Sequence, residues 1–135
     1  MEAAGLPFII KGVLSVEDAL ICAEIGVAGI VVSHHHGIMD SCVPPLQILP
    51  EIVQAVGDKM EIFVDCGIES GSDAFKALAL GAKAVSLGRC IIPVVKEKGA
   101  EGAAEYIQNA TARLAGMMAR TGYATLDEID ESCIF

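Results

Sequence analysis

The sequence predicts an α/β fold in which four consecutive βα units form a parallel sheet. Short apolar runs alternate with segments of helical periodicity, and each crossover helix returns the chain to the same edge of the sheet. Hydrophobic residues make up 53% of the chain, aromatic residues only 4%, and Trp is absent, which is typical of strands covered on both faces by helices. An open doubly wound sheet and part of a closed (β/α)8 barrel both fit this pattern.

The order of the elements can be read along the chain. Its 135 residues predict a single domain, residues 1–135, and a barrel would need about 250, so the barrel interpretation makes the chain a half or a fragment. Ser15 is expected to cap the first helix, and Gly26, Gly81 and Gly122 are expected to close three of the helices. Strands are predicted at residues 7–12, 29–33, 61–65 and 84–87, and helices at residues 16–25, 46–56, 72–80 and 102–120, with a short helix from residue 125.

Charge and cysteine content narrow the functional classes. The formal net charge of −9 argues against nucleic acid and an anionic membrane surface as partners. The five cysteines lack CxxC spacing, so reduced thiols and a cytoplasmic location are expected. The N-terminal residues do not have the basic and apolar regions of a secretory signal, and no apolar run is long enough to predict a transmembrane helix.

Chemically active side chains are concentrated where the predicted strands end. Because parallel strands end at one edge of a sheet, we expect these side chains to lie together. Three consecutive histidines point in different directions, which favours a catalytic histidine over a metal site, and no metal is predicted. A solvated Lys11 and an Asp65 that caps its loop remain alternatives. The strand ends carry Lys11 and Gly12, a Ser-His-His-His-Gly loop at residues 33–37, Asp65, Cys66 and Gly67, and Gly88 and Arg89.

These residues, in this order, resemble the FMN-dependent α-hydroxy-acid oxidases and dehydrogenases, the family of glycolate oxidase and lactate oxidase. The resemblance covers nearly the whole chain and implies that it forms strands five to eight of a (β/α)8 TIM barrel. The matching segments are residues 7–13, 28–33 with the following histidine, 63–65 with Gly67, 73–82 and 88–89.

The resemblance implies a role for each strand-end residue. It implies that Lys11 contacts the flavin ring and stabilises its reduced, anionic N1–C2=O region. It places the catalytic base at His35, which would take a proton from a small 2-hydroxy acid while a hydride passes to flavin N5. Histidine suits this task because its unperturbed pKa lies near working pH. The implied FMN-binding set is Lys11, Ser33, Asp65, Gly67, Gly88 and Arg89, with the Asp-x-Gly loop and the Gly-Arg pair at the phosphate.

Three departures from the family pattern bear on activity. The histidine loop is one residue shorter, which leaves His34 and His36 as alternatives to His35. Ile38 stands nearest to the place of the Arg that clamps the substrate carboxylate. Cys66 replaces a glycine, and Glu69 replaces a phosphate-binding Arg. We therefore expect weak FMN binding and no measurable oxidation of glycolate or lactate by the isolated chain.

Three functional hypotheses follow. The first is a segment of an FMN-dependent oxidoreductase that converts small 2-hydroxy acids to 2-oxo acids. The second is a truncated, non-catalytic relative that serves as a structural or oligomerisation module. The third is another phosphate-binding barrel, of the IMP dehydrogenase or type 2 isopentenyl diphosphate isomerase kind. Because four βα units leave two open sheet edges, we also expect a homo-oligomer or pairing with a missing N-terminal half-barrel.

Overall fold

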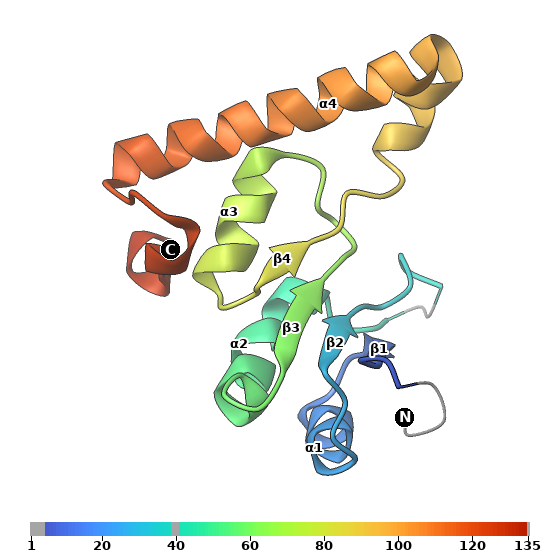
Figure 1. The fold of residues 1–135 in the computed structure, drawn as a ribbon, viewed down its shortest axis with the longest axis vertical. Coiled ribbons are helices and arrows are strands. Elements are labelled where there is room, and N and C mark those ends of the chain that lie inside the picture. The colour runs from blue at the N-terminus through green and yellow to red at the C-terminus, as the bar shows by residue number, and fades with distance from the viewer. Residues whose placement is uncertain (1–4, 39–40, 135) are drawn as a thin grey trace.

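The computed structural model describes residues 5–38 and 41–134, and Met39 and Asp40 of the histidine loop lie outside the described residues. The chain forms one sheet of four parallel strands in the order β1-β2-β3-β4 (Figure 1). The strands are β1 (Ile9–Val13), β2 (Gly29–Val32), β3 (Glu61–Val64) and β4 (Ala84–Val85). This confirms the predicted parallel α/β fold, although β4 stops two residues before the predicted end.

A helix follows each strand, as the alternating pattern predicts. These helices are α1 (Val16–Glu24), α2 (Pro45–Val56), α3 (Gly71–Ala79) and α4 (Ile91–Thr121). The tail forms two short 3-10 turns, Leu126–Glu128 and Glu131–Cys133, where the sequence predicts one short helix. In the part of the chain that the structure describes, no helix combines the length and apolar character needed to cross a membrane.

Serine side chains set the starts of α1 and α3. The Ser15 hydroxyl accepts a hydrogen bond from the backbone N–H of Asp18 at 3.1 Å, which confirms the predicted cap. Ser70 makes the equivalent bond with the N–H of Asp73 at 3.4 Å, so α3 begins one residue earlier than predicted. In both helices a hydroxyl oxygen satisfies a backbone donor that has no partner within the helix.

The predicted start of the last helix, residue 102, is wrong. The helix begins at Ile91, and its first segment is joined to the second across Gly99, whose backbone is not helical (φ 62°, ψ −146°). Pro93 is compatible with this early start because the N–H groups of a first helical turn have no partner within the helix. The glycine at residue 99 supplies the left-handed conformation at the kink.

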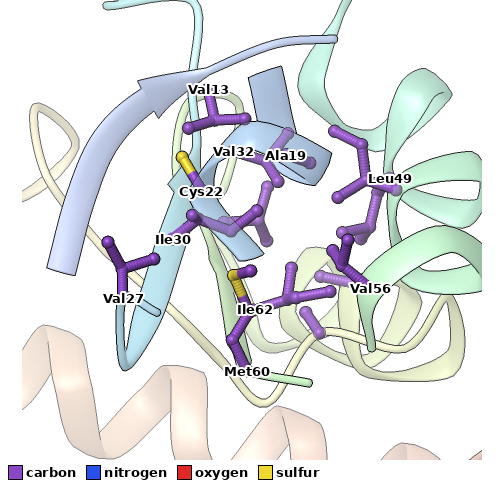
Figure 2. Packing of buried hydrophobic residues seen from close by; sticks show 14 of the residues in the cluster. Val13, Ala19, Cys22, Val27, Ile30, Val32, Leu49, Val56, Met60 and Ile62 are labelled. Carbon is purple, nitrogen blue, oxygen red and sulfur yellow. The ribbon is translucent and has the colours of Figure 1, made fainter. Parts of the chain in front are cut away.

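The two faces of the sheet have different surroundings. On one face, Ile30 and Val32 of β2 and Val64 of β3 are fully buried (0% exposed) among side chains of the helices (Figure 2). The opposite face carries Lys11, Val31 and Phe63 in one register row. These three side chains are exposed or only partly buried. The sheet therefore has one covered face and one open face.

The last two helices cross in close contact. In Figure 1, α4 runs over the end of α3, and the tail returns beside α3. At the crossing, a Cβ added to Gly71 would lie 2.0 Å from the backbone oxygen of Ala110 on α4. Phe75 is fully buried beside Tyr123, with ring centroids 6.3 Å apart. Gly71 therefore sets how closely the two helices approach.

This crossing yields a stability prediction. We expect Gly71→Ala to destabilise the fold by roughly 1–3 kcal/mol, because the new methyl group meets backbone atoms that cannot rotate away. Gly116→Ala is the matched control, since its Cβ would meet only the flexible Arg120 side chain, at 3.6 Å. That change should stabilise the helix by about 0.5–1 kcal/mol. Urea unfolding followed by circular dichroism measures the free energy of unfolding of both variants. An unchanged free energy of unfolding in Gly71→Ala would contradict the close approach of α3 and α4 at this residue.

Candidate active site

The carboxyl ends of the four strands surround one cavity of about 270 Å³. Every predicted site residue except Ser33 lines it: Lys11, His35, Asp65, Gly67, Gly88 and Arg89. Cys66, Glu69 and Ile38, the residues that depart from the family pattern, line it as well. The parallel arrangement thus brings together groups that are far apart in the sequence.

Lys11 connects three strand ends. Its ammonium lies 2.9 Å from Oδ2 of Asp65 and donates a hydrogen bond to Oγ of Ser33, also at 2.9 Å. Ser33 is 1% exposed and lies outside the cavity lining, so it supports the site from beneath. Lys11 lies within β1, and Ser33 and Asp65 follow β2 and β3. All three are on the same face of the sheet, which is why their side chains meet.

Asp65 is held as a carboxylate by its neighbours. Burial favours the neutral acid, but hydrogen bonds from Cys66, Ser33 and Lys11 and the positive charge of Lys11 outweigh it and lower the pKa of Asp65. The Cys66 thiol donates to Oδ1 at 2.9 Å, while Lys11 occupies the other oxygen. The cap alternative for Asp65 is therefore not what the structure shows, since its oxygens face Lys11 and the thiol.

His35 lies over the backbone of β1. A Cβ added to Gly12 would lie 2.5 Å from Nε2 of His35, so a larger residue at this position would displace the ring from where it lies. Gly12 also has a φ of 104° and sits at the irregular register between β1 and β2. The backbone N–H of His35 donates to the Ser33 hydroxyl at 3.1 Å. Sequence reasoning missed this role of Gly12, although a glycine directly after a strand-end lysine was the available signal.

The other two histidines differ in position. Nδ1 of His34 accepts a hydrogen bond from the N–H of Gly37 at 3.2 Å, and His34 is not among the cavity-lining residues. His36 does line the cavity, and its backbone N–H donates to the Cys66 sulfur at 3.2 Å. Of the three candidates, His35 and His36 have access to the cavity.

Cys66, which stands where the family pattern has a glycine, makes several side-chain contacts in the site. Its φ is 67°, in the left-handed region where glycine is favoured, which explains why a glycine suits this position. The side chain nevertheless contacts Asp65, the His36 N–H and, at 3.6 Å, the Ser33 hydroxyl. The thiol thus links the histidine loop to the end of β3.

The cavity lining also includes two glycines, an exposed cation and an exposed anion. A Cβ added to Gly67 or Gly88 would meet nothing within 4 Å, so a ligand can approach the backbone at both. Arg89 and Glu69 are exposed and no ion pair joins them. Tyr106 of α4 donates a hydrogen bond to the Glu69 carbonyl and fixes the loop. A hydrogen bond with Cys90, burial and nearby negative charges raise the pKa of Tyr106 to about 12.

The site offers charged and thiol groups but no metal cluster. Within residues 5–38 and 41–134, no three His, Cys, Asp or Glu side chains are placed to hold a metal ion together. The lining presents the Lys11 ammonium, the imidazoles of His35 and His36 and the Arg89 guanidinium, beside the carboxylates of Asp65 and Glu69.

The sequence profile of the FMN-dependent dehydrogenases matches residues 1–135. The chain belongs to this family. An L-lactate dehydrogenase from Caulobacter sp. is 42% identical over 129 residues, which are 95% of this chain and 34% of that protein. Human 2-hydroxyacid oxidase 2 is 39% identical over 130 residues, 96% of this chain and 37% of that protein. The family assignment does not favour the alternative of an IMP dehydrogenase-like or isomerase-like barrel.

Solved structures of the family share the fold of this chain. A crystal structure of mandelate oxidase superposes with a TM-score of 0.88 at 39% identity, covering 90% of this chain and 37% of that one. A mandelate oxidase variant solved with a monooxide FMN adduct gives a TM-score of 0.87. The four βα units are therefore part of a TIM barrel, which confirms the predicted fold class. The chain spans about a third of the length of the relatives it matches.

The charge state of Asp65 predicts that the free energy of unfolding of this chain depends on pH. A lowered folded-state pKa contributes stability above the unfolded value of about 3.9, and this contribution is lost as pH falls through the folded pKa. We therefore expect Asp65→Asn to be less stable than the parent near neutral pH, with the difference shrinking below about pH 4.

Thermal unfolding of both proteins from pH 7 to pH 3 measures this difference. Asp58→Asn, on an exposed turn outside the cavity, is the matched control for loss of a carboxylate. A stability difference between parent and Asp65→Asn that stays constant across this range would contradict the described pairing.

Proposed function

We propose that this chain is the FMN-binding C-terminal half-barrel of an oxidoreductase that acts on small 2-hydroxy acids. The observation that carries the proposal is the convergence of Lys11, His35, Asp65 and the Gly88–Arg89 pair around one cavity. These residues come from four separate strand ends, and the arrangement agrees with the family to which the chain belongs. Because the chain spans about a third of its relatives, the proposed activity belongs to a larger assembly.

The residues present fit FMN in most respects. Lys11 presents a positive charge at the open face, and its pairing with Asp65 and Ser33 fixes where that charge lies. Gly67 and Gly88 leave their backbones accessible to a phosphate, and Arg89 is an exposed partner for it. Ser33 and Asp65 act by positioning Lys11. When bound, FMN would supply a two-electron acceptor that side chains cannot provide.

His35 is the proposed base of the reaction. Its imidazole lies against Gly12 at the cavity, so a proton released by the substrate hydroxyl can pass to the ring. Its backbone is tied to Ser33, which also binds Lys11, so base and ammonium share one support. His36 lines the same cavity and is the alternative base.

Ile38 is the cavity residue that matches the proposed function least. Ile38 is 76% exposed and lines the cavity where the resemblance calls for a carboxylate-binding Arg. An isoleucine cannot pair with a carboxylate, so substrate orientation has to come from groups outside this segment. We therefore expect no measurable oxidation of glycolate or lactate by the isolated chain. The cytoplasmic location stays a separate prediction.

FMN affinity tests the proposal through Glu69. Its carboxylate shares the cavity with Arg89, and reversing its charge places a second cation near the proposed phosphate position. At an effective dielectric of about 20, unit charges about 4 Å apart interact by roughly 4 kcal/mol, and solvent screens most of this. We expect Glu69→Arg to bind FMN on the order of 10- to 100-fold more tightly than the parent.

Quenching of flavin fluorescence in low salt measures both affinities. Glu51→Arg, on an exposed part of α2 outside the cavity, makes the same charge change and should leave the affinity nearly unchanged. Equal effects of the two variants would indicate a general charge effect and would remove the support for a phosphate site at Glu69 and Arg89.

A further inference from the structure

Two separate segments carry the proposed phosphate site. Gly67 and Glu69 lie on the loop between β3 and α3, and Gly88 and Arg89 lie between β4 and α4. All four residues are outside the strands and helices, so the pairing of the strands does not by itself fix the separation of the two segments. Contacts beyond the sheet have to hold them together.

Tyr106 of α4 contacts both segments. Its hydroxyl donates a hydrogen bond to the Glu69 carbonyl, and α4 passes over the loop at this point (Figure 1). Cys90, which directly follows Arg89, shares a hydrogen bond with the same hydroxyl. The Cys90 sulfur also lies 3.7 Å from the Ile68 carbonyl oxygen. One hydroxyl therefore joins the loop after β3 to the segment after β4.

Other contacts fix the loop from the side of the core and of α3. Ile68 is 3% exposed and packs in the main hydrophobic core. The backbone N–H of Glu69 donates to Oδ2 of Asp73 at 3.3 Å, and its carbonyl accepts from Tyr106, so both polar groups of this peptide unit are bound. The N–H groups of Gly67 and Ile68 donate to no other described residue, which leaves them for an anion in the cavity.

We propose that Tyr106 is a positioning residue for the phosphate group of FMN. Tyr106 is not among the residues that line the cavity, so it acts through the Glu69 carbonyl and Cys90 without touching the ligand. The inference rests on the proposed function, since it concerns the phosphate end of the same site. Every contact that carries it joins two parts of the described chain, so none depends on what covers the open face of the sheet.

A positioning role has a selective effect on ligand binding. Without the hydroxyl, the Gly67 backbone and the Arg89 guanidinium are no longer held at one separation, which weakens binding of a phosphate. Lys11 keeps its bonds to Asp65 and Ser33, so the proposed contact with the flavin ring is unchanged. Riboflavin has the flavin ring and lacks the phosphate. The affinity for FMN should therefore fall while the affinity for riboflavin stays the same.

Fluorescence quenching of FMN and of riboflavin in low salt tests the proposal. We expect Tyr106→Phe to weaken FMN binding roughly 3- to 10-fold, as the loss of one hydrogen bond implies, and riboflavin binding by less than about twofold. Tyr123→Phe is the matched control, because the Tyr123 hydroxyl donates to Asp130 in the tail at 3.0 Å and Tyr123 does not line the cavity. The control should leave both affinities unchanged.

The same two substitutions are also made in the Glu69→Arg background, for which we expect tighter FMN binding. Tyr106 binds the backbone carbonyl of residue 69, so this contact does not require the Glu69 side chain. Urea unfolding followed by circular dichroism checks that each variant folds.

A loss of affinity confined to FMN and to Tyr106→Phe supports the proposal. Unchanged FMN affinity in Tyr106→Phe would overturn it and leave the proposed function standing. An equal loss for FMN and riboflavin would also overturn it, because Tyr106 would then support only the fold. If neither the parent nor Glu69→Arg binds FMN, the proposed function fails, and the positioning role fails with it.

Discussion

The parallel direction of the four strands is the constraint on which the rest of the structure depends. It carries the chain back through a helix after each strand, so one sheet face is covered by helices and the other stays open. It also brings four carboxyl ends to one edge, where Lys11 binds both Asp65 and Ser33. The cavity and the uncovered face therefore both result from the parallel arrangement of the strands. The cavity is built on the strand ends, and its histidines lie on the loop after β2.

The loops at this edge adopt backbone conformations that most residues avoid. His35, His36 and Cys66 all have positive φ values, and each such residue costs on the order of 1 kcal/mol relative to an ordinary conformation. Hydrogen bonds offset this conformational cost: the backbone N–H of His35 donates to the Ser33 hydroxyl, and that of His36 donates to the Cys66 sulfur. Gly12 contributes by leaving space for the His35 ring. The histidine position thus depends on three strand ends at once.

Much of the fold and of the candidate site could be predicted from local sequence, and the remaining features could not. Ser15 marks the start of α1, and the strand-end residues identify the cavity, because capping and strand termination are local properties. The early start of α4 at Ile91 was missed because Pro93 and Gly99 interrupt the helical pattern, and only the tertiary structure shows that the helix spans both. The contact between Gly12 and His35 joins β1 to the loop after β2, so no local pattern reveals it. The contacts of Cys66 with Ser33 and His36 were missed for the same reason.

The central claim, that these strand ends form one FMN site, is tested most directly by nuclear magnetic resonance. Backbone amide spectra of the isotope-labelled chain are recorded during titration with FMN and, separately, with riboflavin. We expect FMN to shift the amide signals of Lys11, His35, residues 65–69 and residues 86–89. Riboflavin should leave Gly88 and Arg89 unperturbed because it has no phosphate. Shifts confined to the tail, or equal shifts at Gly88 and Arg89 with both flavins, would contradict the claim.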